Sequence, residues 1–142
     1  MNFLTKFRDN RGFSLIEIMI VMVIIGLLAS LVGPKLFGKL GQAKQKTAKA
    51  QIEMLMAALD AYRLDVGRYP SQQEGLGALS ANPGAPEWAG PYLAKGQVPL
   101  DPWNHPYILQ IPGQHGEVDI SSLGADNKAG GTGEDADVNS WD

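Results

Sequence analysis

The chain has 142 residues, no cysteine and a formal net charge of −3. Its charge is unevenly spread, because residues 101–142 hold eight of the fifteen acidic residues and only one base, Lys128. This acidic region argues against a nucleic-acid partner and favours either simple solvation or the binding of a hard cation. Without disulfides, a small exported domain would need another clamp, or a partner, if its core is thin.

An apolar stretch from Phe13 to Gly33 is long enough to cross a bilayer as a helix, which needs about 20 residues. The short leader before it carries Lys6, Arg8 and Arg11, which predicts a cytoplasmic N-terminus and an exported remainder. A secretory signal peptide has an apolar core of about 7–15 residues before its cleavage site. The run here is longer and continues into a helical pattern, so we expect a membrane anchor instead.

Glu17 is the one ionisable residue within this stretch. A carboxylate at the centre of a membrane helix costs about 2.5–3.5 kcal/mol on insertion scales, so its presence predicts a function. The motif R-G-F-S-L-I-E-I that begins at Arg11 resembles the class III signal of type IV pilins and pseudopilins. The resemblance implies that a prepilin peptidase cuts after Gly12 and methylates Phe13. An ordinary signal anchor is the alternative, and it leaves both Glu17 and the Gly12–Phe13 junction unexplained.

Residues 35–65 have the periodicity of an amphipathic helix, and Gly67 and Pro70 mark its end. Its apolar stripe consists of Leu36, Leu40, Ile52, Leu55, Leu59 and Tyr62. Lysines occupy the other faces, where they are either solvated or in contact with anionic lipid headgroups. Pro34 removes a backbone hydrogen bond, which predicts a kink in the membrane-resident helix. The resemblance implies instead an unwound segment next to Pro34 in an assembled filament.

Prolines and glycines punctuate residues 67–106, which we expect to be loop-rich apart from a short helix near Gln72 to Leu79. Large side chains from this region are expected to pack against the long helix, because so small a domain needs them in its core. The less favoured alternative is that they form an aromatic groove for carbohydrate or peptide. They are Trp88, Tyr92, Leu93, Trp103 and Tyr107. Alternating residues at 107–111 and 117–121 predict a β-hairpin with residues 112–116 as its turn. Neither His105 nor His115 has a partner for metal binding or catalysis, and we expect surface histidines.

The C-terminal segment from Leu123 to Asp142 contains a run of glycines, and its carboxylates of interest are Asp126, Asp135 and Asp137. Calcium takes about six to eight oxygen ligands from carboxylates and backbone carbonyls, in flexible geometry. A glycine-rich loop flanked by aspartates suits that chemistry, although a disordered acidic tail would have the same composition. The loop is not an EF-hand, because Lys128 stands at the third position counted from Asp126, where that motif has an oxygen ligand.

Beyond the N-terminal signal, D-P-W-N-H-P-Y from Asp101 to Tyr107, then S-L-G-A-D and D-A-D-V-N-S-W, resemble the major pseudopilins of type II secretion. That resemblance implies a calcium-binding loop. Its implied ligands are the side chains of Asp126, Asp135 and Asp137 and the carbonyls of Leu123 and Gly133. The sequence departs from the family pattern at His105, where a glycine-asparagine order is usual, and at Gly133, where some relatives have another acid. We expect Trp141 to anchor the far end of the loop.

No combination of nucleophile, base and phosphate-binding loop is present, so the sequence predicts a structural protein rather than an enzyme. The expected fold is α+β and pilin-like. It comprises a leader (1–12), a transmembrane and assembly helix (13–34) and a periplasmic domain (35–142) that includes the amphipathic helix 35–65, a short antiparallel sheet and the calcium loop.

The resemblance implies an inner-membrane subunit that forms a short periplasmic fibre and drives export of folded proteins. Its implied partners are copies of itself, minor pseudopilins, the inner-membrane assembly platform and the peptidase. In the fibre, Glu17 would neutralise the N-terminal amine of an adjacent subunit, because an unpaired charge in an apolar bundle is costly. Two alternatives stay open here: a type IV pilin for adhesion, motility or DNA uptake, and a monomeric membrane-anchored binding module.

Overall fold

The computed structural model describes residues 12–142, so the leader residues Lys6, Arg8 and Arg11 lie outside the described part. Contacts divide the chain into two compact units, one that ends at Gly38 and one that comprises Lys39–Asp142. The second unit contains all the strands and both 3₁₀ helices.

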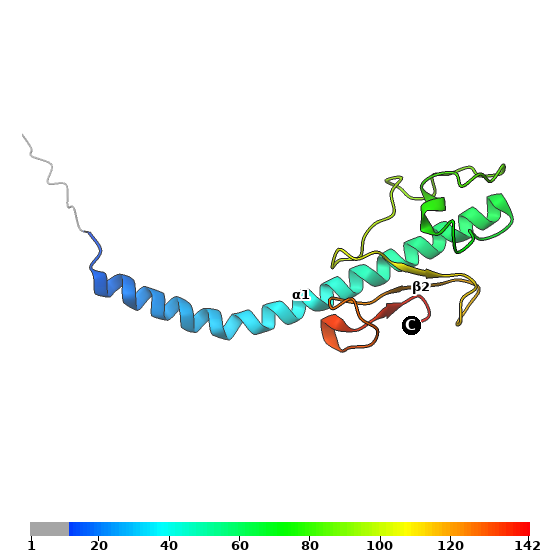
Figure 1. The fold of residues 1–142 in the computed structure, drawn as a ribbon. Helices are drawn as coiled ribbons and strands as arrows, with labels where there is room; N and C mark the ends of the chain where they lie inside the picture. The colour runs from blue at the N-terminus through cyan, green and yellow to red at the C-terminus, as the bar shows by residue number, and fades with distance from the viewer. Residues whose placement is uncertain (1–11) are drawn as a thin grey trace, which may run out of the picture. The chain divides into compact units, whose positions relative to one another are not determined.

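Helix α1 (Leu15–Val66) is 52 residues long (Figure 1). It begins after Ser14, whose Oγ accepts a hydrogen bond from the Glu17 amide at 3.2 Å, as an N-cap residue does. At its other end the Gly67 amide donates to the Arg63 carbonyl, and Gly67 has a φ of 84°, which glycine adopts without steric cost. The helix continues through Pro34, which confirms the prediction of one long helix. Unwinding near Pro34 in a filament stays a prediction.

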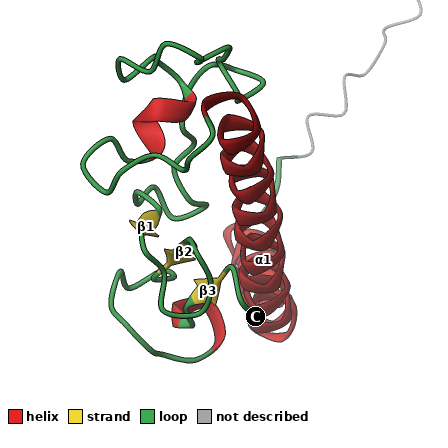
Figure 2. Ribbon diagram, turned by 90° about the vertical axis from the view of Figure 1, so that its right-hand side faces the viewer, coloured by secondary structure: helices red, strands yellow, loops and turns green. Residues whose placement is uncertain are grey.

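The hydrophobic core of the second unit lies between α1 and the loops and strands that follow it (Figure 2). Buried residues of α1 are Ala48, Ile52, Leu55, Ala58, Leu59 and Tyr62. The expected packing of the large side chains is confirmed: Leu93 and Tyr107 are buried in this core, while Trp88, Tyr92 and Trp103 are partly buried against it. The predicted extension of the apolar stripe is not buried, since Leu36 and Leu40 are exposed.

The sheet has three antiparallel strands in the order β1-β2-β3. Strand β1 (Ile108–Gln110) pairs with β2 (Asp119–Ser122), with Leu109 opposite Ile120. This confirms the predicted hairpin. The third strand, β3 (Val138–Asn139), was not expected from the sequence; it pairs with the other edge of β2 and so ties the C-terminal segment to the sheet.

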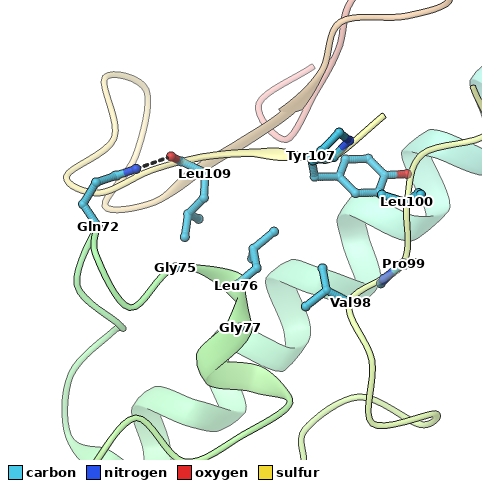
Figure 3. Close-up of a pocket in the computed structure, with 10 residues that line it drawn as sticks. Gln72, Gly75, Leu76, Gly77, Val98, Pro99, Leu100, Tyr107 and Leu109 are labelled. Carbon is cyan, nitrogen blue, oxygen red and sulfur yellow. Dashed lines mark hydrogen bonds between the residues drawn. The ribbon is translucent and has the colours of Figure 1, made fainter. Parts of the chain in front are cut away.

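A side chain covers the outer edge of β1. The Gln72 amide nitrogen donates to the Leu109 carbonyl at 2.7 Å (Figure 3). The Gln72 amide oxygen accepts from the Ile111 amide at 2.8 Å. These bonds satisfy edge groups that would otherwise be open to pairing with another chain. Beside them lies a hollow of about 390 Å³ whose walls include Leu76, Val98 and Leu109.

The expected helix near Gln72 to Leu79 is shorter than predicted. Only Leu76–Leu79 is helical, as a 3₁₀ turn (η1). The Ser71 amide donates to the Glu74 carboxylate at 2.9 Å, and the Glu74 amide donates to Ser71 Oγ at 3.1 Å. This reciprocal pair is typical of the start of a helix. However, Gly75 has φ 62° and ψ −164°, which no right-handed helix accommodates, so the helix cannot begin until Leu76.

Candidate functional site

The junction between Gly12 and Phe13 is open. Among residues 12–142, no atom beyond its chain neighbour lies within 4 Å of the position that a Cβ on Gly12 would take, and Phe13 is 79% exposed. Glu17 lies in the first turn of α1, where the positive end of the helix dipole stabilises a carboxylate. This local role of Glu17 was not predicted from the sequence, although the spacing S-x-x-E from Ser14 is its signal.

Residues 15–32 of α1 form an apolar helix without a covering. The large side chains from Leu15 to Val32 are all exposed, and α1 is the one helix in residues 12–142 that is long and apolar enough to cross a membrane. An apolar surface of this size is stable only in lipid or against other apolar surfaces. Residues 15–32 therefore need either a bilayer or neighbouring helices.

The acidic loop (residues 123–137) is docked on α1. The Gln45 side chain donates from Nε2 toward the carbonyls of Gly133, Glu134 and Ala136 at 3.1, 3.3 and 2.9 Å. These carbonyls belong to or directly follow the short 3₁₀ helix η2 (Gly133–Asp135). The loop is therefore not a free tail in this structure. No feature of the sequence predicted that Gln45 would hold it.

Glu134 is held from several sides. Its Oε1 accepts a hydrogen bond from Trp103 Nε1 at 3.1 Å and lies 3.4 Å from the Lys44 ammonium. The Trp103 bond and the Lys44 charge outweigh partial burial and lower the pKa of the Glu134 carboxyl. Gly41 lies under the same side chain, since a Cβ on Gly41 would be 3.5 Å from Glu134.

Lys49 holds the segment that follows the loop. Its ammonium donates to the carbonyls of Asn139 and Asp142, each at 2.8 Å. The lysines of this helix were expected either to be solvated or to contact lipid headgroups. Two of them, Lys44 and Lys49, contact the acidic C-terminal segment instead.

The predicted ligands have different surroundings. Asp126 is exposed and accepts a hydrogen bond from the Lys128 amide at 3.1 Å, and the Asp135 side chain is exposed. Asp137 is half-buried: its Oδ2 accepts from the Gly130 amide at 2.9 Å, whereas its Oδ1 is buried without a hydrogen-bond partner. No group of three or more acidic, histidine or cysteine side chains placed to hold a metal occurs in the described residues.

Two glycines leave room for a carbonyl inside the loop. A Cβ on Gly124 would be 2.7 Å from the Asp135 carbonyl oxygen, and one on Gly131 would be 2.6 Å from it. Both glycines have positive φ, 70° and 91°, so a side chain at either position would be strained as well as crowded. The Asp135 carbonyl therefore faces the interior of the loop.

The donors in this loop are of the kind that calcium takes. Asp137 Oδ1 is buried and has no hydrogen-bond partner in the described residues. The Asp135 carbonyl oxygen faces the loop interior, so both atoms are oxygens of the kind that calcium binds. The Gly133 carbonyl, in contrast, already accepts from Gln45 and from the Ala136 amide at 3.3 Å. Leu123, the other carbonyl implied by the resemblance, is half-buried immediately before Gly124.

The segment after Asp101 is folded around that carboxylate. Asp101 is 3% exposed; its Oδ1 accepts the amides of Trp103 and His105 at 3.0 and 2.8 Å, and its Oδ2 accepts the Ser122 hydroxyl at 2.7 Å. These bonds tie the D-P-W-N-H turn to β2. The Ser122 hydroxyl also accepts the Gly124 amide at 3.4 Å, so the same network reaches the start of the acidic loop.

The C-terminal tryptophan packs on the hairpin turn. The ring of Trp141 stacks on His115, and His115 Nδ1 lies 3.2 Å from Asp119 Oδ2. Trp141 was expected to anchor the far end of the loop; it does contact the domain through His115, but it remains 42% exposed. His115 has a structural partner that its position in a glycine-rich turn did not reveal.

Comparisons with known proteins cover almost the whole chain. Residues 35–141 match the family model "Type II secretion system (T2SS), protein G", and residues 7–33 match the "Prokaryotic N-terminal methylation motif". The type II secretion system core protein G of Pseudomonas aeruginosa is 48% identical over 140 residues, which cover 95% of this chain and 97% of the relative. The core protein G of Vibrio cholerae is 42% identical and covers 96% of this chain and 94% of its own length.

A solved structure agrees with these relatives. The major pseudopilin from the type 2 secretion system of enterohaemorrhagic Escherichia coli superposes with a TM-score of 0.62 at 32% identity. The match covers 76% of this chain and 95% of that one. The family matches set aside the type IV pilin and the monomeric binding module. The chain belongs to the type II secretion system protein G family, and it is a major pseudopilin, a structural subunit of the secretion system and not an enzyme.

Proposed function

We propose that this pseudopilin is cut after Gly12 by a prepilin peptidase, methylated on Phe13, and then assembled from the inner membrane into a periplasmic fibre. The observation that carries the proposal is the bare apolar surface of residues 15–32 directly behind the open Gly12–Phe13 junction. The match to the methylation motif over residues 7–33 supports the processing step. The basic leader supports a single pass with the C-terminal domain in the periplasm.

Assembly exchanges one apolar environment for another. In the monomer, lipid would cover residues 15–32; in the fibre, the helices of other copies would cover them. Cleavage frees a positive amine on Phe13, and Glu17 of an adjacent copy would neutralise it. Because an unpaired charge inside an apolar bundle is costly, this pairing would fix the axial register of each added subunit. Minor pseudopilins and the inner-membrane assembly platform would be the other partners in assembly.

We also propose that the acidic loop binds calcium. Asp137 and Asp126 would contribute carboxylate oxygens, the Asp135 residue its inward carbonyl, and Leu123 a further carbonyl. The ion would supply positive charge to a segment whose only base is Lys128. The unpaired Asp137 Oδ1 is the feature that supports an ion rather than a solvated tail.

Processing can be tested on the full chain co-expressed with a prepilin peptidase. Intact-mass spectrometry of the membrane fraction should find the chain without its first twelve residues and with one added methyl group. Gly12→Ala should keep the leader, whereas Gly38→Ala, at another glycine with no atom within 4 Å of its Cβ position, should be processed normally. A shortened Gly12→Ala product would place the cleavage site elsewhere.

Calcium binding can be tested by thermal unfolding of the full chain in detergent micelles, with calcium or with excess chelator. A ligand of the native state stabilises it by about 2.7 kcal/mol at a hundredfold excess over its Kd. We expect calcium to raise the melting temperature of the wild type and of Glu53→Ala, an exposed α1 residue, but not of Asp126→Ala. Identical melts in calcium and in chelator would refute calcium binding while leaving the processing proposal intact.

A further inference from the structure

We infer that Gln45 is a positioning residue for calcium binding, an inference that rests on the proposed calcium function of the acidic loop. The side chain of Gln45 projects from α1 and holds η2 in place before any ion is bound. Four consecutive carbonyl groups, those of residues 133–136, differ in whether they contact Gln45.

Three of those carbonyls are turned toward α1. Gly133, Glu134 and Ala136 all direct their oxygens at Gln45 Nε2, within 3.3 Å. An amide nitrogen has only two hydrogens, so three acceptors share them. Such a concentration of carbonyl oxygens is stable only around a positive or strongly donating group, and Gln45 supplies that group.

The fourth carbonyl, that of Asp135, is turned the other way. Its oxygen lies against Gly124 and Gly131, where a Cβ on either glycine would approach to 2.7 or 2.6 Å. Two residues later, Asp137 Oδ1 is buried without a partner. The Ala136 carbonyl also approaches Gly124, since a Cβ there would be 2.8 Å from its oxygen, but it is held by Gln45 as well. The Asp135 carbonyl is therefore the one of the four that faces the loop without a hydrogen bond from Gln45.

This arrangement lowers the cost of ordering the loop. A glycine-rich segment loses much conformational freedom when it is fixed, and that loss opposes binding if it occurs at the binding step. Ordering the segment in advance increases affinity by removing the cost from binding. Gln45 therefore acts on calcium affinity without being a ligand.

The test is isothermal titration of calcium into the full chain in detergent micelles. Gln45→Met keeps the length and shape of the side chain but removes the donor, and we expect its calcium Kd to be about tenfold weaker. The matched control is Gln42→Met, at an exposed position on the same helix, and its Kd should equal that of the wild type. In ¹H–¹⁵N spectra of the wild type, the Gln45 side-chain amide should stay protected from exchange without calcium.

The outcomes separate this inference from the calcium proposal. If the wild type binds calcium and Gln45→Met binds it with an unchanged Kd, Gln45 has no positioning role. If the wild type does not bind calcium, both the calcium proposal and this inference are refuted. Should Gln45→Met fail to fold in chelator, Gln45→Lys, which keeps an N–H donor at the same point, should fold and bind calcium. Failure of Gln45→Lys to do so would contradict the inference as well.

Discussion

The imidazole of His115 stacks on the indole of Trp141, with ring centroids 3.8 Å apart and an interplanar angle of 9°. The first residue lies in the turn between β1 and β2, and the second lies beyond β3. The contact therefore joins the β1–β2 turn to the residues that follow β3. It adds to the hold of Lys49 on the carbonyls of Asn139 and Asp142.

Trp141→Ala should destabilise the protein even though the side chain is 42% exposed. Aromatic pairs contribute about 0.5–1.5 kcal/mol beyond area burial, and we expect a loss of about 1 kcal/mol in the free energy of unfolding. Denaturant unfolding in chelator measures it. Leu64→Ala, at a side chain that is 86% exposed, should change the stability by less than about 0.5 kcal/mol. Equal effects of the two variants would mean that the stack contributes nothing.

Protonation of the Asp119 carboxylate should reduce the stability of the protein in acid. Burial of the Asp119 carboxyl raises its pKa, but hydrogen bonds from the His115 and Gln114 amides and from the His115 ring outweigh burial, so the pKa lies below its ordinary value of 3.8. Because the folded pKa is depressed, the stabilisation is present above the unfolded pKa and disappears as pH falls through the folded pKa.

The measurement is the melting temperature between neutral pH and about pH 2 in chelator. Asp119→Asn should lower the melting temperature at neutral pH and reduce its further decline in acid, because no carboxylate remains to be protonated. Glu53→Gln, at an exposed residue of α1, should reproduce the wild-type profile. An unchanged acid decline in Asp119→Asn would assign that decline to other carboxyl groups.

Periodic patterns explain which parts of the fold were predictable. Apolar residues at helical spacing and alternation over a few residues report burial directly, so α1 and the β1–β2 hairpin follow from the sequence. Strand β3 does not, because its two residues, Val138 and Asn139, have no period of their own and depend on the free edge of β2. The start of η1 depended on the backbone angles of Gly75, and the sequence contains no signal for them.

The same limit applies to the acidic loop. Its composition suggested an ion, but composition does not show which carbonyls face the interior. That direction is set by Gln45, a polar residue of α1 separated from Gly133 by 88 positions. Contacts of this kind arise from tertiary packing. In the sequence, a glutamine on the polar side of a helix has the same pattern whether or not its side chain binds a distant loop.

Gly113 should not tolerate a side chain, although Gly116 in the same turn should. A Cβ on Gly113 would lie 2.6 Å from the Gly116 carbonyl oxygen and 2.7 Å from the Asp119 carboxylate, so the turn would have to open. A Cβ on Gly116 would meet nothing nearer than 3.7 Å. We expect Gly113→Ala to lower the free energy of unfolding by about 1–3 kcal/mol and Gly116→Ala by less than about 0.5 kcal/mol. Chemical denaturation of both variants would compare them, and equal losses would contradict the close approach.

The two roles of Glu17 can be separated by three substitutions. Its amide is capped by Ser14, and its carboxylate suits the first turn of any helix. If Glu17 served only this local purpose, Glu17→Gln should be harmless, because glutamine is also accepted at the third position of a capped helix. Ser14→Ala should then be the damaging change, since it removes the cap.

A role in assembly predicts the opposite pattern. Glu17→Gln and Glu17→Ala should both be cleaved after Gly12 and both stay out of fibres, because each leaves the Phe13 amine of the neighbouring copy without a counter-charge. Ser14→Ala should lose about 1 kcal/mol of helix stability and still assemble. The fibre fraction pelleted from a periplasmic extract, measured by immunoblot beside the membrane-bound fraction, gives the comparison. Normal fibres from Glu17→Gln would show that the carboxylate is a helix-terminus residue and that the register of the fibre is set by apolar packing alone.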